Sequence, residues 1–206
     1  MDYLVTMTTH VPDGTPDGAV ENMRAREAAH SLDLVTQGHL LRLWRPPLRP
    51  GEWRTLGLFA AADRAELESV LVSMPLRVWR TDEVASLAPH PNDPGPQAER
   101  AASSRTPTGG SEFFTTFTIT VPPGTPSDVV DATETSEADR ARELAGQGNL
   151  RRLWVLSGHG RALGLWWAHD AGEMEAILDS LPLRGWSDVE TLPLAPHPSD
   201  PGLDRR

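Results

Sequence analysis

The strongest constraint on this chain is an internal repeat. The segment QGHLLRLWR, at Gln37–Arg45, returns 110 residues later as QGNLRRLWV, at Gln147–Val155. After a three-residue contraction, LAPHP at Leu87–Pro91 returns 107 residues later at Leu194–Pro198. Self-similarity at a fixed period is typical of a duplicated folding unit. The sequence therefore predicts two copies of one unit.

The matched segments give the expected domain boundaries. Repeat 1 is assigned to residues 1–91 and repeat 2 to residues 112–198. Residues 92–111 are rich in Pro, Gly and Ser without an apolar period, which predicts a linker. Residues 199–206 are assigned to a tail.

Both repeats carry the same order of strand and helix patterns. Thr15 before Pro16 predicts a helix N-cap followed by a proline in the first turn, and Gly38 ends that helix. The expected elements of repeat 1 are a strand at 3–11, a helix at 16–37, strands at 39–45 and 53–61, a helix at 63–73 and a strand at 78–87.

This βαββαβ order is that of the ferredoxin-like split βαβ unit, an antiparallel four-stranded sheet with both helices on one face. Apolar residues such as Leu41 and Leu56 would lie on the bare face, which favours packing the two sheets face to face. The predicted fold class is α+β, with two ferredoxin-like βαββαβ repeats forming an intrachain pseudo-dimer. Barrel closure within or between chains, and a further homo-oligomer, stay open.

The basic residues are unusual because the chain has no Lys and no Cys, so all 19 of its Lys and Arg residues are Arg. This excludes thiolate nucleophiles, disulfides, Schiff-base lysines and Walker-type phosphate lysines. Such Arg usage, with abundant Ala, Gly and Pro, is typical of a GC-rich genome and suggests an actinobacterial source.

The charge and the hydropathy narrow the expected partners. A net charge of −10 disfavours nucleic acid, because that affinity rests on neutralising phosphates. The N-terminus shows no signal-peptide pattern, and no apolar run reaches the length of a membrane span. We expect a cytoplasmic protein whose partner is a small-molecule substrate, with no nucleic acid and no membrane.

One carboxylate interrupts an apolar helix face in both repeats. At about 100° per residue, Glu27 falls on the same arc as Val20, Met23 and Leu34. Glu137 takes the matching place in repeat 2. Burial raises the pKa of a carboxyl group toward values useful for general acid–base work. The alternative is a glutamate at the edge of the stripe that reaches solvent or pairs with an arginine.

Strand alternation divides the RLWR segment between two faces. Arg42 and Trp44 share one face, and Leu43 and Arg45 share the other. An arginine that faces an apolar pocket can hold a substrate carboxylate or stabilise an enolate, but it can equally be a solvated cross-strand partner.

Two histidines, His90 and His197, recur just after the last strand of each repeat. They can reach a cleft, or they can simply lie in the Pro-rich segment that follows the strand. The other histidines have no metal-ligand spacing, and no nucleophile elbow, P-loop or dinucleotide motif is present. A metal site is not expected.

Each repeat resembles muconolactone delta-isomerase. The resemblance rests on AREA at Ala25–Ala28, LWR at Leu43–Arg45, the SMPL and SLPL segments and the closing HP, and it covers nearly all of both repeats. It implies a dimeric α/β barrel and an isomerase that moves a proton in an unsaturated lactone without a metal or organic cofactor. It also implies that Glu27 transfers the proton and that Glu137 is its copy.

The sequence departs from the family pattern in ways that favour repeat 1 as the catalytic copy. The family's histidine before LWR is replaced by Arg42 and Arg152, Ser136 replaces Arg26, and Val155 replaces Arg45. The predicted substrate-binding residues are Arg26, Arg42, Trp44, Arg45, His90, Arg152, Trp154 and His197.

Two other functions fit the same pattern. A natural-product cyclase, acting on a polyketide or polyene, or a cofactor-free oxygenase could use the same barrel. A non-catalytic small-molecule-binding protein is the third interpretation, and it would leave both glutamates exposed or locked in salt bridges.

Overall fold

The computed structural model describes residues 1–103 and 109–203 of the chain. These residues form two compact units. Unit 1 comprises Met1–Leu87 together with the segment from Ala195 onward, and unit 2 comprises Ala88–Leu194. The end of each repeat therefore belongs to the unit built mainly from the other repeat.

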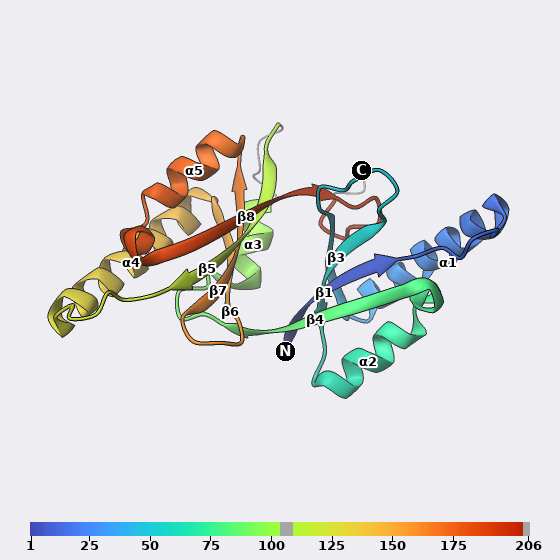
Figure 1. Cartoon of the computed structure of the whole chain (residues 1–206), viewed down its shortest axis with the longest axis horizontal. Helices are drawn as coiled ribbons and strands as arrows, with labels where there is room; N and C mark the ends of the chain where they lie inside the picture. Colours follow the sequence, from blue (N-terminus) through green and yellow to red (C-terminus); the bar gives the residue numbers. More distant parts are fainter. Residues whose placement is uncertain (104–108, 204–206) are drawn as a thin grey trace. The chain divides into compact units, whose positions relative to one another are not determined.

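Unit 1 follows the order expected from the sequence. Its elements are β1 (Asp2–Thr9), α1 (Asp17–Thr36), β2 (Leu40–Arg45), β3 (Arg54–Ala60), α2 (Arg64–Ser73), a 3-10 helix (Pro75–Trp79) and most of β4 (Arg80–Pro89) (Figure 1).

Unit 2 repeats this order after one additional helix. Its elements are α3 (Gly95–Ser103), β5 (Ser111–Ile119), α4 (Ser127–Gln147), β6 (Leu150–Val155), β7 (Arg161–Ala168), α5 (Ala171–Asp179), a 3-10 helix (Pro182–Trp186) and most of β8 (Ser187–Pro196) (Figure 1).

All strand pairings are antiparallel. In unit 1, β1 lies between β3 and β4, and β2 pairs with the other edge of β3. In unit 2, β5 lies between β7 and β8, with β6 beyond β7. The last residues of β8 pair with β2, and the last residues of β4 pair with β6. The fold is thus mixed α+β with an antiparallel eight-stranded sheet and five α-helices in the described residues. The α+β class and the antiparallel strands were predicted, whereas the fifth helix was not.

The core of unit 1 lies between its sheet and its two long helices. Alternate residues of β1 are buried, and they form a cluster with Leu34 of α1 and with Leu67 and Leu71 of α2. Burying one such side chain contributes roughly 1.5–3 kcal/mol. Unit 2 has the matching cluster, which includes Phe113, Leu144 and Met174.

Local structure differs from the expectations in several places. Residues 78–79, expected in the last strand of repeat 1, belong to the 3-10 helix Pro75–Trp79. Thr15 is not the N-cap of α1, because its hydroxyl donates to the carbonyl of Pro12, and Pro16 takes the cap position without a side-chain hydrogen bond. The segment assigned to a linker, 92–111, contains helix α3 and the start of β5.

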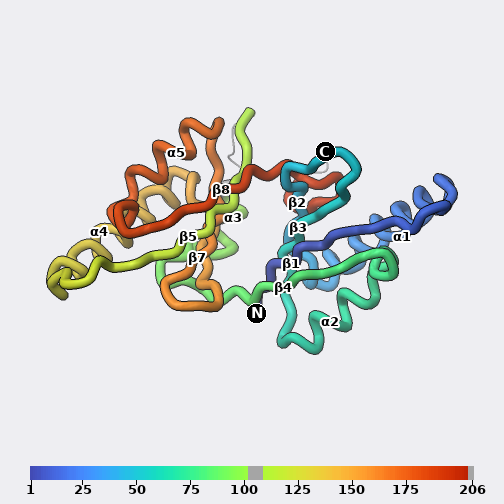
Figure 2. The backbone as a smooth tube through the Cα atoms, viewed as in Figure 1, coloured from blue at the N-terminus to red at the C-terminus, as the bar shows by residue number. Residues whose placement is uncertain are grey.

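The segment assigned to a tail is also structured where it is described. Figure 2 shows that the described segment after β8 lies beside β2 in unit 1. There Asp200 is almost fully buried, and its carboxylate binds Arg42 at 3.1 Å.

Candidate active site

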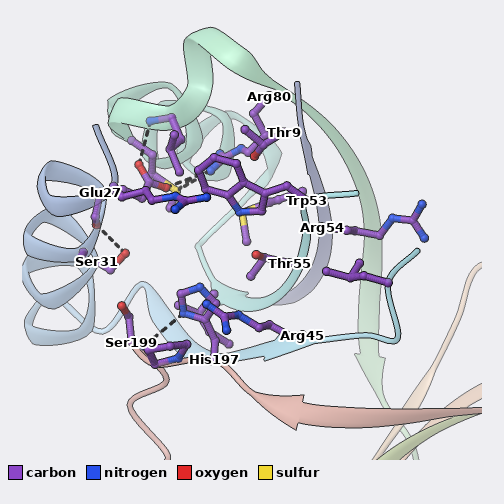
Figure 3. A pocket seen from close by; sticks show the side chains of 18 of the residues that line it. Thr9, Glu27, Ser31, Arg45, Trp53, Arg54, Thr55, Arg80, His197 and Ser199 are labelled. Carbon is purple, nitrogen blue, oxygen red and sulfur yellow. Dashed lines mark hydrogen bonds and ion pairs between the residues drawn. The ribbon is translucent and has the colours of Figure 1, made fainter. Parts of the chain in front are cut away.

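Helix α1 directs Glu27 into a cavity of unit 1 (Figure 3). The Oε2 atom accepts a hydrogen bond from the backbone N–H of Leu76 at 2.8 Å. The Oε1 atom lies 3.2 Å from a guanidinium nitrogen of Arg80, at the first residue of β4. The carboxylate is therefore held from two sides, and its side chain is only 14% exposed.

Arg80 is shared between two buried acids. Its Nε lies 2.6 Å from Asp82, so the guanidinium binds Asp82 as well as Glu27. Burial raises the pKa of Glu27 above its ordinary value. The Leu76 N–H and the positive charge of Arg80 oppose this rise without cancelling it, and the nearby Asp82 adds to it. Glu27 is consequently a carboxyl group whose proton is held more tightly than usual.

The cavity around Glu27 has a volume of about 450 Å³. Four arginines and two glutamates line it: Arg24, Arg45, Arg54, Arg80, Glu27 and Glu52. Figure 3 shows the side chain of Arg54 directed away from the cavity centre. Arg24 stacks on Trp53 with its guanidinium carbon 4.4 Å from the ring centroid. The excess of cations over carboxylates makes this cavity suited to an organic anion.

His197 reaches the same cavity from the chain segment after β8. Its Nδ1 accepts the backbone N–H of Ser199 at 3.1 Å, so the neutral ring carries its hydrogen on Nε2. Burial, assisted by the positive charge of Arg45, lowers the pKa of His197 to about 4, and Asp200 opposes this change. At neutral pH His197 is an uncharged hydrogen-bond donor.

A buried ion pair fixes the segment that carries His197. Asp200 pairs with Arg42, and its Oδ1 accepts the N–H of Leu43 at 2.9 Å. In unit 2, Asp93 pairs with Arg152 at 3.2 Å and accepts the N–H of Leu153. The repeat extends beyond HP, as HPNDPG at 90–95 and HPSDPG at 197–202. That six-residue signal identifies both aspartates.

Unit 2 has a second cavity that contains Glu137 and His90. Glu137 accepts the N–H of Leu183 at 2.9 Å, and burial raises its pKa. Ser187 occupies the position that Arg80 has in unit 1. His90 accepts the N–H of Asn92 on Nδ1, and burial lowers its pKa. The glutamate–histidine combination is thus present in both units.

The predicted site residues fall into two groups. The structure brings Glu27, Arg45 and His197 together in the unit 1 cavity, and Glu137 and His90 together in the unit 2 cavity. Arg26 is exposed on α1 and lies outside the lining of either cavity.

The strand residues Arg42, Trp44, Arg152 and Trp154 also lie outside both linings, since alternation turns them away from the cavities. Each arginine instead stacks on its tryptophan, at 4.8 Å in unit 1 and 4.6 Å in unit 2. Sequence reasoning missed three lining residues, namely Arg24, Trp53 and Arg80.

Comparison with protein families decides the relationship. The family model for muconolactone delta-isomerase matches residues 1–93 and again residues 111–200. The chain belongs to the muconolactone delta-isomerase family. Muconolactone Delta-isomerase 1 of Acinetobacter lwoffii is 32% identical over 92 residues, which cover 45% of this chain and 93% of that protein. Muconolactone Delta-isomerase of Cupriavidus pinatubonensis is 30% identical over 92 residues, 45% of this chain and 97% of that protein.

Solved structures resemble the two-repeat chain over nearly its whole length. A heme-binding protein from Thermus thermophilus matches with a TM-score of 0.59 and 12% identity, covering 96% of this chain and 92% of that chain. Chlorite dismutase from Candidatus Nitrospira defluvii matches with a TM-score of 0.55 and 11% identity, covering 95% and 91%. At such identities the likeness shows the fold alone.

These neighbours correct the function predicted from the sequence. The prediction that this chain is a cofactor-independent isomerase of an unsaturated lactone is wrong. Proteins that share its arrangement over both repeats are named for heme binding and chlorite dismutation, whereas each named isomerase matches fewer than half of its residues. The family names indicate an enzyme, without fixing that reaction.

The three histidines that line the two cavities, His90, His159 and His197, do not fit an axial heme ligand. An iron-ligating histidine usually donates its other ring N–H to a carboxylate or carbonyl. His90 and His197 do the opposite, since Nδ1 accepts a backbone N–H in each, which leaves hydrogen rather than a lone pair on Nε2. His159, the third cavity histidine, is exposed between β6 and β7. We therefore derive no chemistry through heme.

Within the described residues, no group of three metal-ligating side chains converges. In the same part of the chain, no helix has the length and apolar character needed to cross a membrane.

Proposed function

We propose that unit 1 of this family member is an acid–base catalytic centre for a small organic anion, with Glu27 as the proton-carrying group. The observation that carries the proposal is the placement of a largely buried carboxylate with a raised pKa inside a cavity lined by arginines. Isomerisation is the reaction named for the relatives. For this chain we propose only that unit 1 binds an anion and exchanges a proton with it.

The cations of the cavity support an anionic ligand. Arg45 and Arg24 line the cavity, and Arg45 lies close enough to His197 to lower the pKa of its ring. A guanidinium can hold a carboxylate through two parallel hydrogen bonds. Because Arg80 is already bound by Asp82 and Glu27, we assign anion binding to Arg45 and Arg24 and the tuning of Glu27 to Arg80.

The remaining groups suit a proton transfer. A carboxyl group works best as a general acid or base when its pKa lies near the working pH, and burial moves Glu27 in that direction. His197 presents an uncharged N–H donor in the same cavity, which can stabilise negative charge that develops on a ligand oxygen.

Calorimetry with benzoate and benzamide tests this function without knowledge of the natural reaction. We expect benzoate to bind the unit 1 cavity at least about tenfold more tightly than benzamide binds there, equivalent to about 1.4 kcal/mol. A bound anion raises the pKa of Glu27 further, so benzoate binding near pH 7 takes up a fraction of a proton. Titrations in buffers of different ionisation enthalpy measure that uptake.

Two matched variants test which glutamate takes up the proton. Glu27→Gln should abolish the uptake, and Glu137→Gln should retain it because Glu137 lies in the other unit. Arg45→Leu should weaken benzoate binding about tenfold. Equal affinities of the unit 1 cavity for benzoate and benzamide, or uptake that survives in Glu27→Gln, would overturn the proposal.

A further inference from the structure

The two cavities differ in charge at matched positions. Arg24, Arg45 and Arg80 of repeat 1 are replaced by Glu134, Val155 and Ser187 in repeat 2. The only arginine in the described lining of the unit 2 cavity is Arg184, accompanied by Glu134 and Glu137. An anion that suits unit 1 would therefore meet a net excess of carboxylates in unit 2.

The cavities also differ in size and in the residue at one matched wall position, which is Trp53 in unit 1 and Gly160 in unit 2. The N–H of Thr9 bonds to the carbonyl of Trp53, and the N–H of Ile119 bonds in the same way to Gly160, each at 2.8 Å. Trp53 and Gly160 therefore hold the same structural position. At Gly160 a Cβ would lie 2.5 Å from the carbonyl oxygen of Ile119, so a side chain is excluded. The unit 2 cavity measures about 820 Å³, against about 450 Å³ in unit 1.

One part of the wall of the larger cavity is apolar and aromatic. Phe117 and Trp166 meet edge to face with ring centroids 6.4 Å apart, and both line the cavity. The indole N–H of Trp166 is already bonded to Thr115 at 2.7 Å, so the ring offers mainly apolar contact. Polar side chains of Thr55 and Ser31 in unit 1 become Ala162 and Ala141 in unit 2.

Among the polar residues of this lining, Glu137 and His90 each present a polar atom to a ligand. Glu137 keeps its backbone hydrogen bond to Leu183, and its second oxygen is available because Ser187 stands where an arginine binds Glu27. His90 offers Nε2–H, since Nδ1 is occupied by the N–H of Asn92. Such a pair can bind a hydroxyl or carbonyl group within an apolar pocket.

We propose that the unit 2 cavity is a second small-molecule site, specific for a neutral aromatic molecule that bears a hydroxyl or carbonyl group. This site goes beyond the proposed function of unit 1 and does not depend on it. The duplication would then have produced two binding sites of different charge preference from one ancestral cavity.

The test uses 2-naphthol and 2-naphthoate, which share a ring system and differ in charge near pH 7. Calorimetry on the full chain should show that the unit 2 cavity binds 2-naphthol at least about tenfold more tightly than 2-naphthoate. This ratio corresponds to a difference of about 1.4 kcal/mol in binding free energy. Ala138→Trp, on the α4 face that lines the cavity, should weaken 2-naphthol binding at least tenfold. Ala28→Trp is the matched change in unit 1 and should leave 2-naphthol binding unchanged.

If circular dichroism shows that Ala138→Trp does not fold, a second variant that changes the charge of the cavity still tests the proposal. Glu134 is exposed, and Glu134→Arg restores the cation of repeat 1, so it should strengthen 2-naphthoate binding to unit 2. The proposal is overturned if 2-naphthol does not bind, if Ala28→Trp rather than Ala138→Trp weakens it, or if Glu134→Arg leaves the naphthoate affinity unchanged. None of these results bears on benzoate binding in unit 1.

Discussion

Arg80 lies 3.2 Å from the carboxylate of Glu27 and 2.6 Å from that of Asp82, so one guanidinium serves two acids in unit 1. The three side chains are nearly buried and carry a net negative charge when both acids are ionised. Repeat 2 has Ser187 and Val189 at the positions of Arg80 and Asp82. The pKa values of Glu27 and Glu137 are thus both raised, although the two carboxyl groups have different surroundings.

Replacing Arg80 by methionine should raise the pKa of Glu27 further, because the positive charge of Arg80 opposes the effect of burial. The variant also leaves Glu27 and Asp82 without this buried partner, and breaking such a pair costs about 3–5 kcal/mol of unfolding free energy. Carboxyl carbon NMR follows the pKa, and urea unfolding follows the stability.

The matched control is Ser187→Arg, which introduces a cation near Glu137. It should lower the pKa of Glu137 while leaving that of Glu27 unchanged. A Glu27 pKa that falls or stays constant in Arg80→Met would contradict the assigned role of Arg80.

The sequence predicted the elements of each repeat but not the partners of its charged residues. Strand alternation and helix stops are local, so the βαββαβ order could be inferred from the repeat. Arg42 was expected near a substrate, yet its partner Asp200 lies 158 positions away in the supposed tail. Arg80 likewise lies 53 positions from Glu27. Contacts at such separations depend on the folded path of the chain, which alternation does not encode.

Stability should increase with pH between about 4 and 6.5 because of His197. The folded ring has a pKa of about 4 and the ordinary value is 6.5, so the unfolded chain binds more protons in this range. The contribution is fully present above pH 6.5 and is lost as the pH falls toward 4. Urea midpoints at pH 5 and pH 7 should differ less for His197→Gln than for the unmodified chain. An unchanged difference would mean that other groups carry the dependence.

Asp200→Ala should release the segment that carries His197. Arg42 loses a buried partner and the Leu43 N–H loses its acceptor, so we expect a loss of about 3 kcal/mol or more. Hydrogen exchange of the Leu43 amide should accelerate. Asp93→Ala in unit 2 is the matched variant, because it removes a partner of Arg152 and the acceptor of the Leu153 N–H. Unchanged exchange of the Leu43 amide in Asp200→Ala would contradict the role assigned to Asp200.

Glu137→Gln should stabilise the chain at neutral pH, even though it alters a buried polar group. Burial raises the folded pKa of Glu137 above 4.5, so the neutral form favours folding and that contribution is lost as the pH rises through the folded pKa. Glutamine is uncharged at every pH and can still accept the N–H of Leu183 through its amide oxygen. The gain should therefore appear at pH 7 and disappear below about pH 4, where both side chains are neutral. Urea unfolding at the two pH values measures it, and destabilisation at pH 7 would show that the ionised carboxylate is needed by the fold.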